Sequence, residues 1–205
     1  MGIVSNPVKL NELCNKFNIK NYAETGVGRG DSLRKMFSLG CIERFYGIEV
    51  DERLYNSYAQ MFSNYPVDFF YGYSHEVMSD LVEKLNDSPT LFWLDAHFPG
   101  CYFSEGFDEP DLVKRLPLEQ ELSIISDGRN ISNDVIIMDD LRMYVDRQFS
   151  DGNWDKREIL GGNGYQFVID ILEKTHTIKE HYADQGYILA FPNKFSEEDI
   201  MSVIK

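Results

Sequence analysis

The sequence predicts an α/β fold in which helices cover both faces of a doubly wound, mostly parallel seven-stranded sheet with an antiparallel terminal hairpin. The first observation is an alternation of short β-rich runs with longer segments of helical spacing. The second is a pair of nearly continuous apolar runs, 90–94 and 135–138, typical of central parallel strands buried on both faces. The third is a turn at 183–186 between two β-rich runs, which favours the hairpin.

The first half of the chain alternates helix and strand. Apolar residues at helical intervals predict a helix over 7–18, with Pro7 in its first turn. A strand follows at 20–25, and a glycine-rich loop then leads into a helix that begins at Asp31 and ends at Gly40. We next expect a strand at 44–50, a helix from Asp51, a strand at 67–71 and a helix over 75–85.

The second half continues this pattern with longer connections. The expected elements are a strand at 90–94, a helix over 117–126, a strand at 135–138, a helix over 164–174, hairpin strands at 177–182 and 187–191, and a terminal helix over 196–205. Connections 97–116 and 141–162 are unusually long for a compact domain. Such loops more often serve as lids or binding loops, so we expect them to contact the substrate. No linker or internal repeat divides the sequence, which predicts a single domain over residues 1–205.

The composition is that of an acidic globular protein. Acidic residues outnumber basic residues by 34 to 20, which gives a formal charge of −14 and an isoelectric point of about 4.6. The average surface therefore repels phosphate backbones and anionic membranes, and we expect neither duplex nucleic acid nor a membrane as a partner. The 43% share of hydrophobic residues suits a packed core and excludes a disordered chain, collagen and a coiled-coil rod.

The sequence shows no sign of a membrane anchor or a disulfide framework. No apolar run approaches the roughly 20 residues that cross a bilayer, and residues 1–7 lack a basic segment followed by an apolar one. We therefore expect a soluble, cytoplasmic protein. The cysteines, Cys14, Cys41 and Cys101, are odd in number and lack CxxC spacing, so we interpret them as ordinary thiols. The sequence leaves the oligomeric state open and is compatible with a homo-oligomer.

Polar residues gather at the predicted carboxyl ends of the strands, where ligands bind in open α/β sheets. They are Glu24 to Gly30 after the first strand, Glu49 and Asp51 after the second, Gly72 to His75 after the third, Asp95 and His97 after the fourth, and Asp139 and Asp140 after the fifth. This distribution predicts a ligand site along one edge of the sheet.

The glycine-rich loop resembles the dinucleotide fingerprint G-x-G-x-x-G but departs from it. Asp31 stands where that fingerprint has its third glycine, and its carboxylate suits a pyrophosphate poorly. No Lys-[Ser/Thr] follows for a nucleoside triphosphate. The loop is therefore either a plain turn or part of a nucleoside site, and Glu49 favours the second reading because a carboxylate there can accept both ribose hydroxyls.

Together these features resemble the class I S-adenosylmethionine (SAM)-dependent methyltransferases, a family with a Rossmann-like fold. Glu24 to Gly30 fits the family pattern E-x-G-x-G-x-G, and Glu49 ends the second strand as the family's ribose-binding acid does. The resemblance extends over nearly the whole chain. It implies SAM as the cofactor, bound by Glu24, Thr25, Gly26, Gly28, Gly30, Ser32, Glu49, Val50, Ser74, His75 and Asp95.

Three aspartates suggest a metal. Asp95, Asp139 and Asp140 follow two strands predicted to be neighbours, and convergent carboxylates suit Mg²⁺ or Mn²⁺. The pattern resembles the metal-dependent O-methyltransferases of the catechol and macrolide-sugar type. Two alternatives stay open: Asp95 and Asp139 cap turns or face the methyl donor without a metal, or one of the paired aspartates binds Arg142.

The expected chemistry is methyl transfer to a hydroxyl of a small molecule or of a sugar or glycan precursor. Asp95 and His97 are the expected catalytic residues, with His97 as general base. The catechol enzymes have a lysine a few residues after this aspartate, whereas this chain has Phe98-Pro99-Gly100, so His97 is equally compatible with a structural hydrogen bond in the loop. We assign no catalytic role to the amphipathic segment 117–122.

Other functions remain as alternatives. A DNA amino-methyltransferase is expected to carry an acidic or polar residue followed by Pro-Pro-[Tyr/Phe] after the fourth strand, where this chain reads Asp95-Ala96-His97-Phe98. The remaining alternatives are a SAM-binding enzyme with other chemistry, such as N-methylation or cofactor cleavage, and a non-catalytic binding module that keeps the fold. The three aspartates favour an enzyme, because a scaffold has no need to concentrate unpaired carboxylates.

Overall fold

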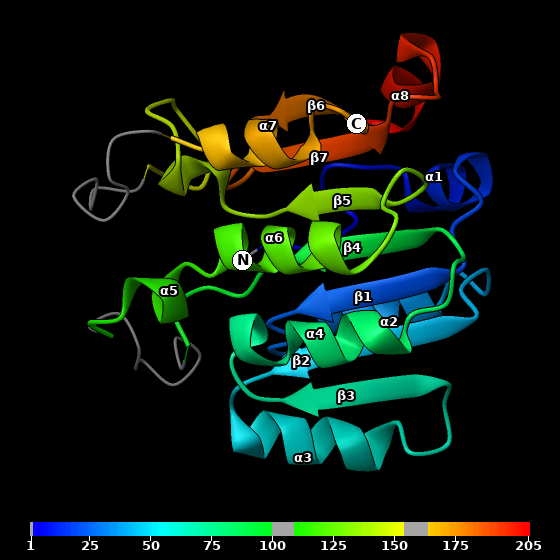
Figure 1. The fold of residues 1–205 in the computed structure, drawn as a ribbon, viewed down its shortest axis with the longest axis vertical. Helices are drawn as coiled ribbons and strands as arrows, with labels where there is room; N and C mark the ends of the chain where they lie inside the picture. Colours follow the sequence, from blue (N-terminus) through cyan, green and yellow to red (C-terminus); the bar gives the residue numbers. More distant parts are fainter. Residues whose placement is uncertain (1, 100–108, 154–163) are drawn as a thin grey trace.

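The computed structural model describes residues 2–99, 109–153 and 164–205 and contains the predicted sheet. Seven strands lie in the order β3-β2-β1-β4-β5-β7-β6, and β7 runs antiparallel to both of its neighbours (Figure 1). The strands are β1 (Asn21–Thr25), β2 (Arg44–Glu49), β3 (Val67–Tyr71), β4 (Thr90–Leu94), β5 (Val135–Met138), β6 (His176–His181) and β7 (Tyr187–Pro192). The strand order reverses between β1 and β4, which is where open α/β sheets bind ligands.

Helices cover both faces of the sheet, as predicted. One face packs against α1 (Leu10–Lys16), α2 (Asp31–Phe37), α3 (Glu52–Met61) and α8 (Glu197–Val203). The other packs against α4 (Ser74–Lys84), α6 (Leu118–Gly128) and α7 (Gln166–Leu172), which lie side by side in Figure 1. Strands β1, β4, β5 and β7 are buried along their whole length, so the sheet separates two apolar cores.

The predicted bounds of the first and last helices are wrong by a few residues. Helix α1 begins at Leu10 rather than in the turn containing Pro7, and α8 ends at Val203. The reason is a short antiparallel bridge between Val8 and Ile204, which holds both segments in extended conformation. The N–H of Lys9 donates to the carbonyl of Val203 over 2.8 Å. A pairing between residues so distant in sequence competes with the local helical pattern and prevails over it.

The long connections are described in part. Helix α5 (Leu112–Arg115) lies beyond the carboxyl ends of β1 and β4 (Figure 1), and a 3₁₀ helix (Leu141–Met143) follows β5. Residues 100–108 and 154–163, with Cys101 and much of both predicted substrate loops, lie outside the described residues. Among the helices that the structure does describe, none combines the length and hydropathy of a membrane span.

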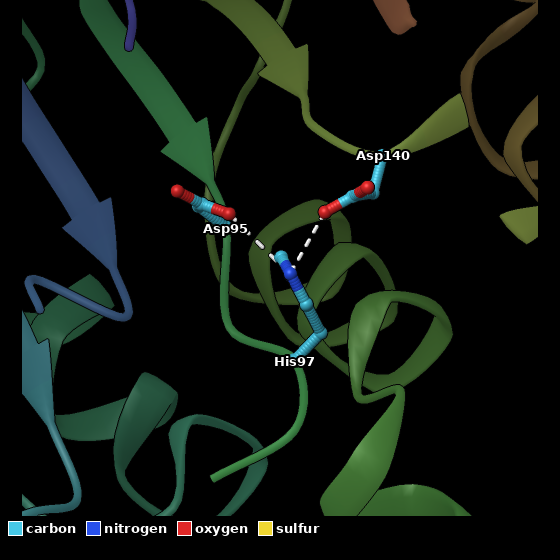
Figure 2. A group of neighbouring side chains, drawn as sticks. All are labelled: Asp95, His97 and Asp140. Atoms are coloured by element: carbon cyan, nitrogen blue, oxygen red, sulfur yellow. Dashed lines mark ion pairs between the residues drawn. The ribbon is translucent and has the colours of Figure 1, made fainter. Parts of the chain in front are cut away.

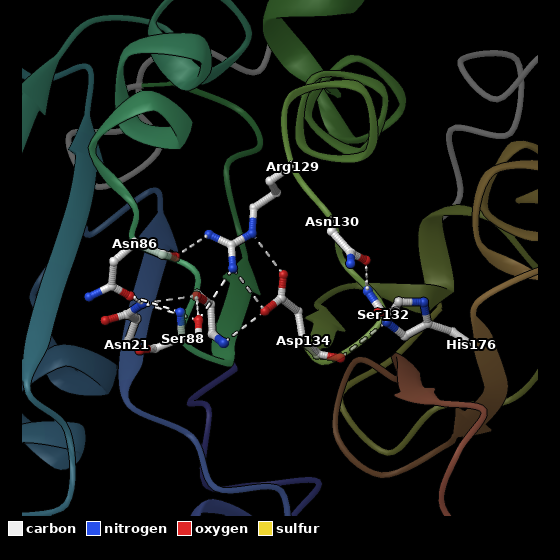
Figure 3. Close-up of polar contacts among 9 residues, drawn as sticks. Asn21, Asn86, Ser88, Arg129, Asn130, Ser132, Asp134 and His176 are labelled. Carbon is white, nitrogen blue, oxygen red and sulfur yellow. Dashed lines mark hydrogen bonds and ion pairs between the residues drawn. The ribbon is translucent and has the colours of Figure 1, made fainter.

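A buried ion pair fastens the opposite edge of the sheet, at the amino ends of the strands (Figure 3). The Nε atom of Arg129, which follows α6, lies 2.9 Å from a carboxylate oxygen of Asp134, which precedes β5. Asp134 also accepts the N–H of Thr90 over 2.8 Å. Burial raises the pKa of Asp134 to about 6, although Arg129 favours the charged form. This pair fixes the entry into the two central strands β4 and β5.

Candidate functional site

A cleft opens at the carboxyl ends of β1 and β4, where small-molecule sites of open α/β sheets lie. The sequence predicted its position from the strand ends. Seven of the predicted cofactor residues line it: Gly26, Gly28, Glu49, Val50, Ser74, His75 and Asp95. The structure thus brings together residues that lie up to 69 positions apart in the sequence.

Gly26 forms the floor of the cleft at the end of β1. Its φ of +70° lies in the left-handed region, and a Cβ atom built on it would lie 2.7 Å from the carbonyl oxygen of Asp95. Any side chain would therefore both strain the backbone and push against the neighbouring strand end. Glycine at this position therefore lets the ends of β1 and β4 approach each other closely at the floor of the cleft.

Glu49 is held rigidly at the end of β2. One carboxylate oxygen accepts the N–H of Gly28 over 2.7 Å, and the other accepts the N–H of Asp51 over 2.8 Å. Burial raises the pKa of Glu49, whereas these backbone donors work to lower it. Each oxygen keeps one lone pair for a further donor, so the carboxylate can accept two vicinal hydroxyls.

Four predicted cofactor residues lie beneath the cleft rather than among the residues that line it: Glu24, Thr25, Gly30 and Ser32. Glu24 is 2% exposed and accepts the hydroxyl of Tyr22 over 3.0 Å. Thr25 accepts the N–H of Asp95 through its Oγ1 atom over 3.2 Å, and Ser32 accepts the N–H of Val4 over 3.1 Å. Gly30 caps α2 with a φ of +69°. In this structure these residues support the loop from below.

Tyr73, within the predicted segment Gly72 to His75, also lines the cleft, as does Lys114, which the sequence did not single out. The ammonium group of Lys114, on α5, lies 4.6 Å from the centre of the Tyr73 ring. The Tyr73 ring in turn lies 5.8 Å from that of His75. These groups form an aromatic wall with a cation above it. The composition of the 97–116 connection had indicated a binding loop but not which side chain would contact the cleft.

Asp95, His97 and Asp140 form one group beside the cleft, with ligand atoms all within 4.8 Å of one another. Figure 2 shows the three side chains converging from the end of β4 and the turn after β5. The Nε2 atom of His97 lies 2.8 Å from Asp140 Oδ2, and its Nδ1 atom lies 3.4 Å from Asp95 Oδ1. The Nε atom of Arg142 lies 2.7 Å from the other carboxylate oxygen of Asp140. The alternative in which one of the paired aspartates binds Arg142 is therefore confirmed for Asp140.

Charge determines the protonation of this group. Burial favours neutral His97, but the charges of Asp140 and Asp139 outweigh it and raise the pKa of His97. Burial likewise works against the charge of Asp140, yet His97 and Arg142 hold the pKa of Asp140 below its ordinary value. His97 and Arg142 thus favour the charged form of Asp140. The φ of Asp140, +58°, lies in a region that aspartate tolerates better than most residues.

Asp139, the third predicted metal ligand, does not belong to this group. It is 5% exposed, and neither carboxylate oxygen has a hydrogen-bond partner among the described residues. Gly2 packs directly on it, since a Cβ atom at Gly2 would lie 2.2 Å from Asp139 Oδ2. Burial raises the pKa of Asp139 to about 7, and the neighbouring Asp140 charge adds to this. Burial and the charge of Asp139 also raise the pKa of Asp95.

Glu121 is a buried acid that the sequence interpretation passed over. It is 1% exposed and lies behind the group, where it lines a small cavity with His97, Asp139 and Asp140. Burial raises the pKa of Glu121 to about 7, while the hydroxyls of Ser74 and Thr25 and the charge of His97 favour its charged form. A signal was present in the sequence: Glu121 falls on the same helical face as the apolar residues Leu118, Leu122 and Ile125.

The sequence comparisons find no match, whereas the structure comparisons find solved structures of similar fold. No protein-family model and no curated protein sequence matches the chain. A provisional caffeoyl-CoA O-methyltransferase from Staphylococcus aureus is 16% identical, with coverage of 90% of this chain and 81% of the other and a TM-score of 0.60. A SAH-bound methyltransferase from Podospora anserina is 13% identical, with 90% and 76% coverage and a TM-score of 0.60.

A third solved structure has a different name. Spermidine synthase from Thermotoga maritima is 13% identical, with coverage of 93% of this chain and 61% of the other and a TM-score of 0.53. One fold hosts different reactions, so likeness at this level of identity identifies architecture and not chemistry. The chain therefore has the Rossmann-like fold of the class I SAM-dependent methyltransferases.

Proposed function

We propose that this protein is a SAM-dependent methyltransferase that acts on a hydroxyl oxygen of a small molecule or of a sugar or glycan precursor. The observation that carries this proposal is the arrangement of the cleft beside the Asp95–His97–Asp140 group. A cradle for a nucleoside and a proton-accepting group meet at the same strand end. Methyl transfer requires both, because the acceptor must be aligned with the donor and must lose its proton.

Three features of the cleft support this cofactor. Glu49 keeps a free lone pair on each oxygen for the ribose hydroxyls. The wall at Tyr73 and His75 offers flat surfaces to the adenine ring. Asp95 lines the cleft, and a cationic sulfonium donor would favour the charged form of its carboxyl, whereas an anionic dinucleotide would not.

The donor set at the three-residue group fits a divalent cation. Asp95, His97 and Asp140 would hold the ion, since one ligand atom from each lies within 4.8 Å of the others. An imidazole beside two carboxylates suits Mn²⁺ better than Mg²⁺, which prefers oxygen ligands. A divalent ion held by Asp95, His97 and Asp140 would lower the pKa of a bound acceptor hydroxyl.

Without a metal, the residues of the group suit proton transfer instead. Asp140 is anchored by Arg142 and accepts a hydrogen bond from His97 Nε2, which fixes the orientation of the ring. The neutral form of His97 with its proton on Nε2 leaves the lone pair of Nδ1 directed toward Asp95. An acceptor hydroxyl placed beside Asp95 can then give its proton to Nδ1 as the methyl group moves to its oxygen.

Two measurements test the proposal. We expect isothermal titration calorimetry to show binding of SAM and S-adenosylhomocysteine, and a screen with labelled SAM to show methylation of a sugar or phenol hydroxyl. Absence of SAM binding would overturn the proposal. Rapid loss of SAM without an acceptor would indicate cofactor cleavage instead of transfer, and labelling of amines alone would indicate N-methylation.

The metal is tested separately. We expect a chelator to abolish turnover and Mn²⁺ to restore it better than Mg²⁺. Full turnover in the presence of chelator would remove the metal from the proposal and leave His97 as the general base. In that case His97→Asn should lower kcat by about 10²- to 10⁴-fold with little change in the affinity for SAM.

A further inference from the structure

Glu121 lies behind the cleft, in a position that the proposed function does not use. It comes from α6, on the face of the helix that packs against the sheet, and its side chain is 1% exposed. Its Oε1 atom has no hydrogen-bond partner among the described residues. A buried carboxyl without a partner is costly, so its presence needs an explanation other than the stability of the fold.

Two hydroxyl groups of the cofactor region are its neighbours. Ser74 begins α4, lines the cleft and is 5% exposed, and its Oγ atom has no partner among the described residues either. Thr25 ends β1, and its Oγ1 atom accepts the N–H of Asp95. Both hydroxyls lie close enough to favour the charged form of Glu121. Each of these hydroxyls has a proton to donate, and Glu121 is the nearby acceptor.

We propose that Glu121 is a positioning residue for the cofactor: its carboxyl accepts hydrogen bonds from Ser74 and Thr25 when the cleft is filled, and so fixes the two sides of the cleft. This inference rests on the proposed function, because it assumes that SAM fills the cleft. Ser74 stands on the side of Tyr73 and His75, and Thr25 stands beside Gly26. One carboxyl on α6 therefore links the adenine side to the methionine side.

The same placement links the cofactor to the reacting group. Thr25 holds the backbone of Asp95, and Glu121 shares a cavity of about 10 Å³ with His97 and Asp140. A cavity of that size holds about one water molecule. Loss of the Glu121 carboxyl should therefore disturb cofactor binding first, with a smaller effect on the transfer step, because no hydrogen bond joins Glu121 directly to the three-residue group in the described residues.

The test compares three variants. Glu121→Met keeps the volume and removes the acceptor, Glu121→Gln keeps an acceptor oxygen, and Glu119→Gln is the matched control, an exposed acid two positions away on the same helix. We expect the Met variant to raise the KM and Kd for SAM about tenfold, the Gln variant to recover to within about threefold, and the control to equal the wild type. The kcat should change less than the KM.

Thermal unfolding separates positioning from a merely structural role. Removal of an unpartnered buried carboxyl should leave the Tm of Glu121→Met equal to or above that of the wild type, while SAM binding weakens. A fall in Tm in proportion to the loss of binding would contradict the proposal. Equal SAM binding by the wild type and Glu121→Met would overturn this proposal alone, whereas absence of SAM binding by the wild type would overturn the proposed function and this inference with it.

A second variant covers the case in which Glu121→Met does not fold. Ser74→Ala removes the donor from the other side of the same hydrogen bond. If Glu121 acts in part through Ser74, the loss of SAM affinity in the double variant Glu121→Gln, Ser74→Ala should be smaller than the product of the two single losses, with the remainder due to Thr25. Independent, multiplicative losses would show that Glu121 does not act through Ser74 and would overturn the proposal.

Discussion

Replacement of Glu49 by glutamine tests the cofactor site most directly. The two oxygens of Glu49 accept the N–H groups of Gly28 and Asp51 over 2.7 and 2.8 Å. Glutamine can satisfy only one of these donors, because its NH₂ group then faces the other. The substitution therefore disturbs the loop on which the ribose would lie and removes one of the two acceptors for the ribose hydroxyls.

The size of the effect follows from the geometry. A hydrogen bond to a charged group contributes about 1.5 to 3 kcal/mol. At about 1.4 kcal/mol for each factor of ten, the loss of one ribose contact should weaken SAM binding by roughly 10- to 150-fold. The free energy of unfolding should change less, since burial raises the pKa of Glu49 and the neutral side chain is relieved of part of that cost.

Calorimetric titration with SAM and with S-adenosylhomocysteine measures this loss. Glu52→Gln is the matched control, because Glu52 is an exposed acid three positions away in the first turn of α3 and the change in charge is the same. The control should bind as the wild type does. Equal affinity of Glu49→Gln and wild type would refute the assignment of Glu49 to the ribose. An equal loss of SAM affinity in Glu49→Gln and Glu52→Gln would show that the change in net charge, and not a ribose contact, is responsible.

Three further predictions concern the fold and the cleft. Asp134→Asn leaves Arg129 buried without its counter-charge, so we expect a loss of about 3 to 5 kcal/mol and a fall in Tm of roughly 6 to 20 °C; an unchanged Tm in calorimetry would show that the pair is dispensable. Gly26→Ala should abolish most SAM binding, whereas Gly152→Ala, at a φ of +88° in open space, should not, and equal losses would show that backbone strain alone is responsible. Without ligand, the free energy of unfolding should fall as the pH rises from about 4 to 7, because in the folded protein Asp134 and Glu121 have pKa values of about 6 and about 7, above their unfolded values, and the stabilising protons are lost between the unfolded and the folded pKa. Glu121→Gln should flatten the profile in denaturant titrations, and a profile that rises with pH would contradict this.

The sheet could be predicted because its strands carry local signals. The runs at 90–94 and 135–138 are apolar throughout, and the structure buries both completely. Helix bounds were harder at the two ends of the described chain, where Val8 pairs with Ile204. That pairing joins segments almost two hundred positions apart, and no pattern within either segment indicates it.

The sequence could predict at which strand ends the site lies, but not which side chains there contact one another. Glu49 and Asp95 lie where the motif placed them. The sequence grouped Asp139 with Asp95 and Asp140, but β5 ends at Met138, and the backbone turns at Asp140, whose φ is +58°. Gly2 packs on the Asp139 carboxylate, and the structure places His97 in the group instead. Glu121 was missed because an acid on an amphipathic helix normally faces solvent, although its position on the apolar face with Leu118, Leu122 and Ile125 indicated burial.

The arrangement of charge connects the stability of the protein with its proposed function. Glu24, Asp95, Asp139 and Asp140 meet at one strand edge, where His97 and Arg142 supply the positive charge among the described residues. Without a ligand the excess is relieved by protons, since burial and mutual repulsion raise the pKa values of Asp95 and Asp139. A sulfonium donor or a divalent ion would replace those protons, so the affinity of the site for a cation should rise with pH while the stability of the ligand-free protein falls. The acids that weaken the empty fold are then the same acids that make it selective for a cationic ligand.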